Sequence, residues 1–151
     1  MKYLLRLAAL TALVAAPSHA ADQSWSAEQA SAWAFVTTAW QRHADAGTWY
    51  KSMDPNFYGW TTGYPVPTDR ATHKRRADVF GAEGKILFHR LDPLAVAISA
   101  DTAIAYYFAE IVEQDHKGAR KTSAQRCSNT LVRRRAQWHI LGWMCDTKSE
   151  G

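Results

Sequence analysis

The second half of the chain is dominated by runs of β-branched and aromatic residues separated by turn signals. The runs are KILFHRLD (85–92), LAVAISA (94–100) and TAIAYYFAEIVEQ (102–114), with turns expected at Asp92-Pro93 and Ala100-Asp101. A further turn is expected in HKGA (116–119), and the segment 126–145 reads as a final hairpin. Strands joined by short turns pair antiparallel, so this half of the chain predicts an antiparallel meander.

Helical patterns precede these strands. Ser26 and Gln29 have the spacing of a capping box, and apolar residues then recur at helical spacing as far as a stop at Gly47. A helical turn (48–53), a short aromatic strand (56–60) and a second helix (about 70–80) capped by Thr68 or Asp69 follow. Helices first and a meander last predict an α+β domain, with the long helix and shorter helices packed on a strongly curved antiparallel sheet.

The first twenty residues have the layout of a secretory signal peptide. Lys2 and Arg6 precede an apolar run over 7–16, and small residues lead to a cleavage site near Ala20. The run is shorter than the roughly 20 residues that span a bilayer, and no later segment is longer, so no membrane span is expected. We therefore expect a leader over 1–20 and one periplasmic or secreted domain over 21–151.

The chain has two cysteines, Cys127 and Cys145. A hairpin with a three-residue loop over 135–137 would place Arg134 opposite Trp138 and Cys127 opposite Cys145. In an oxidising compartment such a pair is expected to form a disulfide, and the alternative is two unpaired buried thiols. The spacing matches neither zinc modules nor thiol-exchange motifs, so we expect no metal site.

Charge and motifs exclude several function classes. Without Lys2 and Arg6 the basic residues fall from 18 to 16 against 14 acidic residues, which leaves a net charge of about +2. The basic runs at 73–76 and 133–135 read as solvated surface, and no nucleic-acid motif is present, so no nucleic-acid partner is expected. No P-loop, dinucleotide fingerprint or metal motif occurs, and we expect no cofactor.

Three stretches resemble a known family. They are LDPLAVAISADTAIAYYF (91–108), KGARKTSAQRCSNTLVRRRAQWHILGWM (117–144) and AGTWYKSMDPNF (46–57). With the order of elements, they make the chain resemble the SnoaL-like branch of the nuclear transport factor 2-like (ketosteroid isomerase-like) superfamily. The resemblance implies a cone-shaped fold with a central pocket, and frequently a homodimer formed through the sheet. It does not imply one activity, because this fold hosts several enzyme classes and non-catalytic modules.

The resemblance also directs attention to polar residues within apolar strands. Catalytic members of such a superfamily use a carboxylate as proton shuttle and a Tyr or Asp donor in an apolar cavity that tunes their pKa values. On this basis the catalytic candidates are Tyr107, His89 and Arg126. The ligand-binding candidates, which would add an aromatic wall, are Tyr58, Trp60 and Trp143.

Each catalytic candidate has a structural alternative. Tyr107 shares a strand face with several alanines, which either leave room for a ligand or make ordinary core packing. His89 lies either on a wet face or in the core. For Arg126, an ion pair is favoured over anion binding, because carboxylates are plentiful on the neighbouring strand: Glu110, Glu113 and Asp115.

The sequence thus predicts an exported pocket protein that binds a small molecule of apolar or mixed polarity. Cofactor-free acid/base chemistry of the isomerase or dehydratase type would take place in the pocket. The alternative is a non-catalytic dimerisation or ligand-sensing module of the cell envelope. Glu110 shares a face with Tyr106 and Phe108, opposite to Tyr107, and the absence of a convincing carboxylate pair on one face favours this second interpretation.

Overall fold

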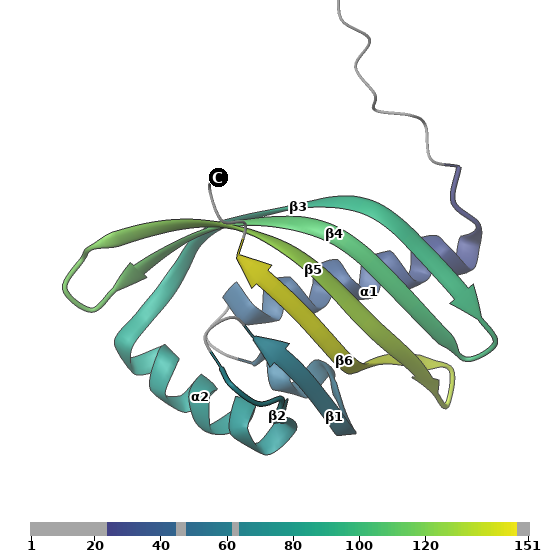
Figure 1. The fold of residues 1–151 in the computed structure, drawn as a ribbon, viewed down its shortest axis with the longest axis horizontal. Coiled ribbons are helices and arrows are strands. Elements are labelled where there is room, and N and C mark those ends of the chain that lie inside the picture. The colour runs from purple at the N-terminus through teal and green to yellow at the C-terminus, as the bar shows by residue number, and fades with distance from the viewer. Residues whose placement is uncertain (1–23, 45–47, 62–63, 148–151) are drawn as a thin grey trace, which may run out of the picture.

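The computed structural model describes residues 24–44, 48–61 and 64–147 (Figure 1). The predicted leader over 1–20, its cleavage site and the helix stop at Gly47 lie outside the described residues. The described part is an α+β domain, as the sequence predicted. Its elements are α1 (Ala27–Ala44), the 3-10 helix η1 (Trp49–Ser52), β1 (Met53–Thr61), β2 (Thr68–Asp69), α2 (Arg70–Glu83), β3 (Gly84–Ser99), β4 (Thr102–Asp115), β5 (Arg120–Arg134) and β6 (Gln137–Thr147).

The strands form one six-stranded sheet in the order β2-β1-β6-β5-β4-β3. Strands β3 to β6 make the predicted antiparallel meander, but β1 runs parallel to β6. The prediction of a strongly curved, wholly antiparallel sheet was therefore wrong, because the sheet is mixed and is not strongly curled. No short turn joins β1 to β6, and nothing in the connection forces those two strands to be antiparallel.

The predicted turn at Asp92-Pro93 was also wrong, because β3 continues through it as one strand. The register against β4 shifts between Pro93 and Ala95, which marks an irregularity at this point. Proline is tolerated here because β3 is an edge strand, where a missing N–H donor breaks no ladder on the open side. The predicted turn at Ala100-Asp101 is confirmed.

The hairpin of β5 and β6 pairs Cys127 with Cys145, and their sulfur atoms are joined at 2.10 Å. The predicted three-residue loop was wrong: the loop is Arg135 and Ala136, both at positive φ (49° and 65°), and Arg134 pairs with Gln137. Between Ile140 and Gly142, β6 carries one extra residue, which shifts the register by one. The shift compensates for the shorter loop, so the cysteine pairing was predicted correctly.

Helix α1 begins with the predicted capping box. The Ser26 N–H donates to Gln29 Oε1 (2.9 Å), and the Gln29 N–H donates to Ser26 Oγ (3.2 Å). The Gln29 amide also donates to the carbonyl of Val96 on β3 (2.7 Å), which ties the start of the helix to the sheet. The helix buries Ala32, Val36 and Ala39 against the sheet, where it lies over β3 and β4.

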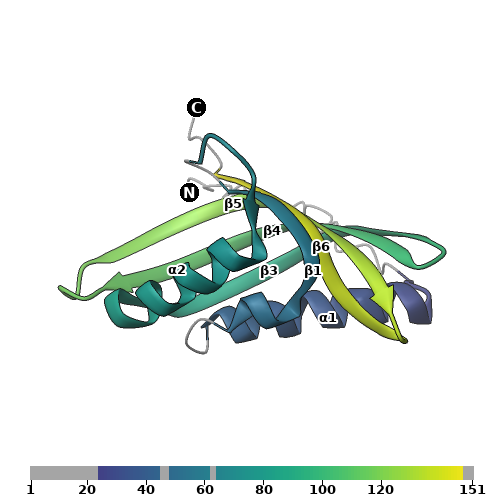
Figure 2. The same ribbon diagram turned by 90° about the horizontal axis from the view of Figure 1, so that it is seen from below.

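The two faces of the sheet differ in character. Both α1 and α2 lie on the same side of the sheet (Figures 1 and 2). On β4 the residues facing the helices are buried, namely Ala103, Ala105, Tyr107, Ala109 and Ile111. Alternate residues Tyr106 and Phe108 are exposed on the opposite, outer face. The alanines keep the inner face shallow, which lets α1 approach and leaves space beside the one large ring, Tyr107.

Candidate functional site

A cavity of about 180 Å³ lies between α1, η1 and the inner face of β4, β5 and β6. Its walls are mainly aromatic and aliphatic, with a few polar groups. The lining residues are Ala39, Trp40, His43, Trp49, Tyr107, Ile111, Glu113, Gln125, Asn129, Ile140, Trp143 and Cys145. Three indole rings from three different elements thus surround the space.

Tyr107 connects the walls of this cavity. Its hydroxyl donates to Asn129 Oδ1 on β5 (2.6 Å) and accepts from Trp40 Nε1 on α1 (2.9 Å). The side chain is 1% exposed, and burial raises the pKa of the phenol far above its usual value of 10. Tyr107 therefore stays protonated and acts as a neutral hydrogen-bonding group.

His43, from the last turn of α1, lies between two of these indoles. Its ring centroid is 4.4 Å from that of Trp49 and 5.4 Å from that of Trp40. Burial, together with the nearby His73 and His89, lowers the pKa of His43 to about 4. The imidazole is therefore neutral near pH 7 and adds a polar but uncharged group to the cavity wall.

His73, on α2, is not a lining residue, but it contacts two indole rings of the cavity wall. Its Nδ1 accepts from Trp49 Nε1 (3.4 Å), so Nε2 carries the proton and donates to Thr68 Oγ1 (2.8 Å). The Thr68 hydroxyl in turn donates to the carbonyl of Gly59 (3.4 Å). Burial, together with the nearby Arg76 charge, lowers the pKa of His73 to about 4, in keeping with this neutral tautomer. The His73 and Trp143 rings also make an edge-to-face contact, with their centroids 4.8 Å apart.

Neither histidine was among the residues proposed from the sequence. His43 lies three residues after Trp40, so the predicted apolar stripe of α1 carried a signal for its inward position. His73 was assigned to a solvated basic run, whereas it is 3% exposed. Its neighbours Lys74 and Arg75 are exposed. The composition of this basic run therefore gave no indication that His73 alone points inward.

The structure brings some of the predicted residues together. Tyr107 and Trp143 line the cavity, and Trp143 packs over Gly59, where any Cβ would overlap the indole ring. His89 lies on the inner face and stacks on Trp40 (6.1 Å between centroids). His89 is not one of the lining residues, and it contacts the cavity wall through the Trp40 ring.

The structure places the other predicted residues elsewhere. Arg126 is exposed and its guanidinium pairs with Asp146 on β6 (3.4 Å), not with the carboxylates of β4 that were expected. It precedes the inward-facing Cys127, so strand alternation points it to the outer face. Tyr58 and Trp60 are 64% and 47% exposed for the same reason, because they alternate with the buried Phe57 and Gly59. None of the three lines the cavity.

Across residues 24–44, 48–61 and 64–147, no group of three His, Cys, Asp or Glu side chains is placed to hold a metal ion. Over the same ranges, no helix is long and apolar enough to cross a membrane.

The Tyr107 hydroxyl allows a matched test of this geometry. Tyr107→Phe leaves the Asn129 carbonyl and the Trp40 N–H without their partner, and it should lower the free energy of unfolding by about 1–3 kcal/mol. Tyr106→Phe, one residue away on the outer face, should change it by less than about 0.5 kcal/mol. Urea denaturation of both variants measures the difference. Equal stability of the two variants would show that the bridge contributes nothing.

The lowered pKa of His43 predicts acid sensitivity. The unfolded imidazole titrates near 6.5 and the folded one near 4, so the unfolded chain binds more protons between these values. The free energy of unfolding should therefore fall as pH falls from 6.5 towards 4, by on the order of 3 kcal/mol from this group. In urea denaturation at pH 7 and pH 4.5, His43→Phe should lose less stability than the native chain. His116→Gln, in an exposed turn, should match the native chain, and an equal loss in all three would refute the assignment.

The comparisons with known proteins concern the fold. No family model matches the chain, and no curated protein matches it in sequence. Among solved structures, a ketosteroid isomerase-like protein from Erwinia carotovora atroseptica superposes with a TM-score of 0.69 at 17% identity, over 83% of this chain and 99% of that one. A Catenulispora acidiphila protein in complex with S-DNPA gives 0.62 at 15% identity, over 79% and 95%.

A third similar structure, Aln2 from a Streptomyces species, gives a TM-score of 0.59 at 18% identity, over 77% of this chain and 90% of that one. At such identities these likenesses concern the arrangement of the backbone and not the activity. The chain has the nuclear transport factor 2-like (ketosteroid isomerase-like) fold.

Proposed function

We propose that the protein binds a small, largely apolar molecule in the cavity beneath α1. One observation carries this proposal: a cavity of about 180 Å³ is walled by the rings of Trp40, Trp49 and Trp143 and contains a neutral tyrosine-asparagine hydrogen bond. Binding sites for small molecules combine apolar walls with a few placed polar groups in this way. One of the similar structures was solved in complex with S-DNPA, so a protein of this fold binds a ligand.

The cavity limits what the ligand is. A dry cavity of about 150 Å³ accommodates a benzene ring, and drug-sized ligands need about 300 Å³ or more. The ligand is therefore about the size of a single substituted ring. His43 and Tyr107 are uncharged near neutral pH, and the Glu113 carboxylate at the cavity edge disfavours an anion. A neutral ring with a hydroxyl or carbonyl group fits these walls.

Chemistry in the cavity would need no cofactor but has few groups to carry it. His43 and the Glu113 carboxylate are the proton acceptors among the described lining residues, and Tyr107 is a neutral hydrogen-bonding group. A base whose pKa is about 4 is weak at neutral pH, which is why binding is the function that the geometry supports best. In this proposal His89 does not line the cavity and contributes only by stacking on Trp40. Arg126 takes no part, since it lies on the outer face.

Two matched variants test the cavity. Ile111→Phe adds a ring to the cavity lining, whereas Ile104→Phe adds the same ring on the other face of the same strand. With 4-fluorophenol as the probe, ¹⁹F NMR should show saturable binding to the native chain with a Kd between about 10 μM and 1 mM. We expect Ile104→Phe to bind equally and Ile111→Phe to bind at least about tenfold more weakly. No saturable binding, or equal binding by both variants, would overturn the proposal.

The outer face of the sheet supports a second candidate function, a non-catalytic dimerisation module. Tyr106, Ser128, Met144 and Trp60 are neighbours in one row across four strands, and the three apolar members are 45%, 54% and 47% exposed. Exposed apolar side chains gathered on one face in this way mark a candidate protein–protein contact surface.

The charges beside this strip suit a second copy of the chain. Arg90 and Arg126 lie next to Asp92, Glu110 and Asp146, so both signs occur on the same face. A twofold axis brings identical surfaces together, and a surface with both signs is complementary to itself. We propose that a second copy covers this face.

Sedimentation velocity tests the dimer. The native chain should sediment as a dimer at micromolar concentration, and Met144→Lys should make it monomeric, because a lysine in the centre of the strip would be buried without a partner. Ala34→Lys, at an exposed position of α1 on the other side of the sheet, should leave the dimer intact. A monomeric native chain, or a dimer that survives Met144→Lys, would rule out this interface.

The disulfide between Cys127 and Cys145 bears on the location of the protein. Such bonds persist in oxidising compartments and are rare in the cytosol. Together with the leader pattern over 1–20, it supports our proposal that the protein is exported to the periplasm or beyond.

A further inference from the structure

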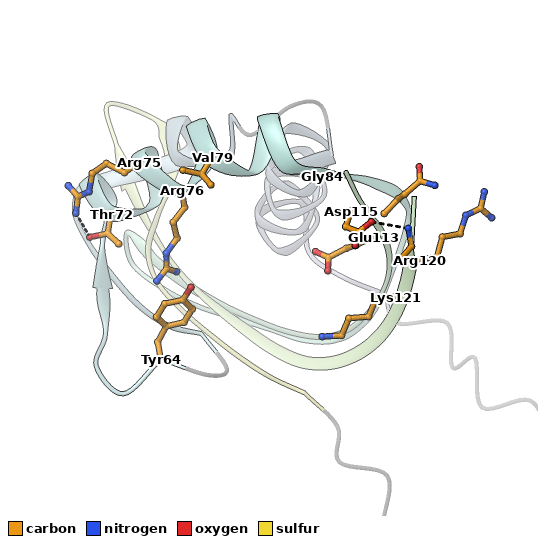
Figure 3. Close-up of a pocket in the computed structure, with 12 residues that line it drawn as sticks. Tyr64, Thr72, Arg75, Arg76, Val79, Gly84, Glu113, Asp115, Arg120 and Lys121 are labelled. Atoms are coloured by element: carbon orange, nitrogen blue, oxygen red, sulfur yellow. Dashed lines mark hydrogen bonds between the residues drawn. The ribbon is translucent and has the colours of Figure 1, made fainter. Parts of the chain in front are cut away.

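A second hollow, larger than the cavity, lies between α2 and the neighbouring ends of β4 and β5 (Figure 3). This groove has a volume of about 670 Å³, within the range typical of small-molecule sites. Its lining residues are Tyr64, Thr72, Arg75, Arg76, Val79, Gly84, Glu113, Gln114, Asp115, Ala119, Arg120 and Lys121. Two of them, Arg75 and Arg76, come from the basic run 73–76, which was predicted to be solvated surface.

The groove carries an excess of positive charge. Among the described residues that line it, four are basic and two are acidic. The Asp115 carboxylate is already satisfied, because it accepts the backbone N–H groups of Lys117 and Ala119 (both 2.9 Å). Within the part of the chain that the structure describes, none of the four basic side chains forms an ion pair within 4.0 Å, in contrast to Arg90, Arg126, Arg133 and Arg134.

One of these charges is held in place. The Arg76 guanidinium extends from α2 into the groove and lies 3.5 Å above the centroid of the Tyr64 ring (Figure 3). Stacking fixes the plane of a guanidinium and leaves its N–H edges free to donate to a carboxylate, sulfonate or phosphate. Lys121 reaches into the same space from β5 (Figure 3). Two cations from opposite walls therefore converge on the space between them.

The apolar part of the lining narrows the class of ligand. The Tyr64 ring, the Val79 side chain and the aliphatic stems of the arginines give the groove a largely apolar surface. An inorganic anion would use the charges and leave this surface wet. We propose that the groove binds a small organic anion, in which a carboxylate, sulfonate or phosphate group is attached to apolar rings or a short chain.

This site is independent of the aromatic cavity and takes a ligand of different charge. Glu113 borders both hollows, and it follows Tyr107 and Ile111 along the same face of β4. In the strand register, its neighbour on β5 is Lys121. The inner face of the sheet thus changes from neutral and aromatic under α1 to charged under α2.

Two fluorescent probes that differ in one group test the proposal. 8-Anilino-1-naphthalenesulfonate carries an anionic sulfonate, and N-phenyl-1-naphthylamine has the same rings without it. The native chain should bind the sulfonate at least about tenfold more tightly than the neutral probe, and this advantage should shrink as salt is raised. Lys121→Gln and Arg76→Gln should each weaken sulfonate binding several-fold, with little effect on the neutral probe.

Controls separate this site from the others. Arg90→Gln and Arg126→Gln remove the same charge on the outer face and should bind the sulfonate like the native chain. Ile111→Phe fills the cavity and should also leave sulfonate binding unchanged, so a failure of the cavity proposal is distinguishable from a failure of this one. Equal affinity for both probes, or native-like binding by Lys121→Gln and Arg76→Gln, would overturn the proposal. Tight binding of a heparin fragment without binding of the sulfonate would also overturn it, in favour of an anionic polymer.

Discussion

The hydroxyl of Tyr107 holds three elements of this fold together. It receives a hydrogen bond from Trp40 of α1 and donates one to Asn129 of β5, while its own backbone lies in β4. The bond to Asn129 is buried and the bond from Trp40 is partly buried, and an unpaired polar group costs more in such places than it would in water. The position of α1 over the sheet is thus fixed by directional bonds as well as by apolar contact. The cavity lies directly beside this junction.

The cavity exists because its walls are rigid rings that cannot collapse into it. Trp143 packs over Gly59 and makes edge-to-face contacts with Phe57 and His73. His73 is itself held by hydrogen bonds on both ring nitrogens. Flexible aliphatic side chains in these places would have relaxed into the empty volume. The same close packing keeps His43 and His73 neutral, so the polarity of the cavity follows from its packing.

Local patterns were read correctly where neighbouring residues decide the structure. The capping box of Ser26 and Gln29 and the pairing of Cys127 with Cys145 depend on spacing within one helix or one hairpin. The parallel pairing of β1 with β6 could not be read in this way, because about half of the chain separates the two strands. Proline at position 93 suggested a turn because sequence alone does not show which strand lies at the edge of the sheet.

The candidate site shows the same division. Alternation placed Tyr107 on the alanine-rich face of its strand, and that face proved to be the inner one. Applied from Cys127, the same rule turns Arg126 outward, so this assignment was within reach of the sequence. The helical stripe indicated the inward position of His43, but the rings around His43 and His73 could not be read from the sequence, because Trp49 and Trp143 belong to other elements of the fold. A sequence shows that a histidine lies on a helix, but not which rings will surround it.

Glu113 explains how one sheet face supports two hollows of different character. Along β4 the inner residues run from Tyr107 through Ile111 to Glu113, and the covering element changes from α1 to α2 along the same path. Under α1, burial keeps the cavity-lining His43 and Tyr107 neutral, because a charge would be desolvated there. Under α2 the wider groove is lined by Arg76, Arg120 and Lys121, and none of these three side chains forms an ion pair with another described residue. A carboxylate at the boundary repels an anion from the cavity and lies opposite the cations of the groove, which keeps the two hollows chemically distinct.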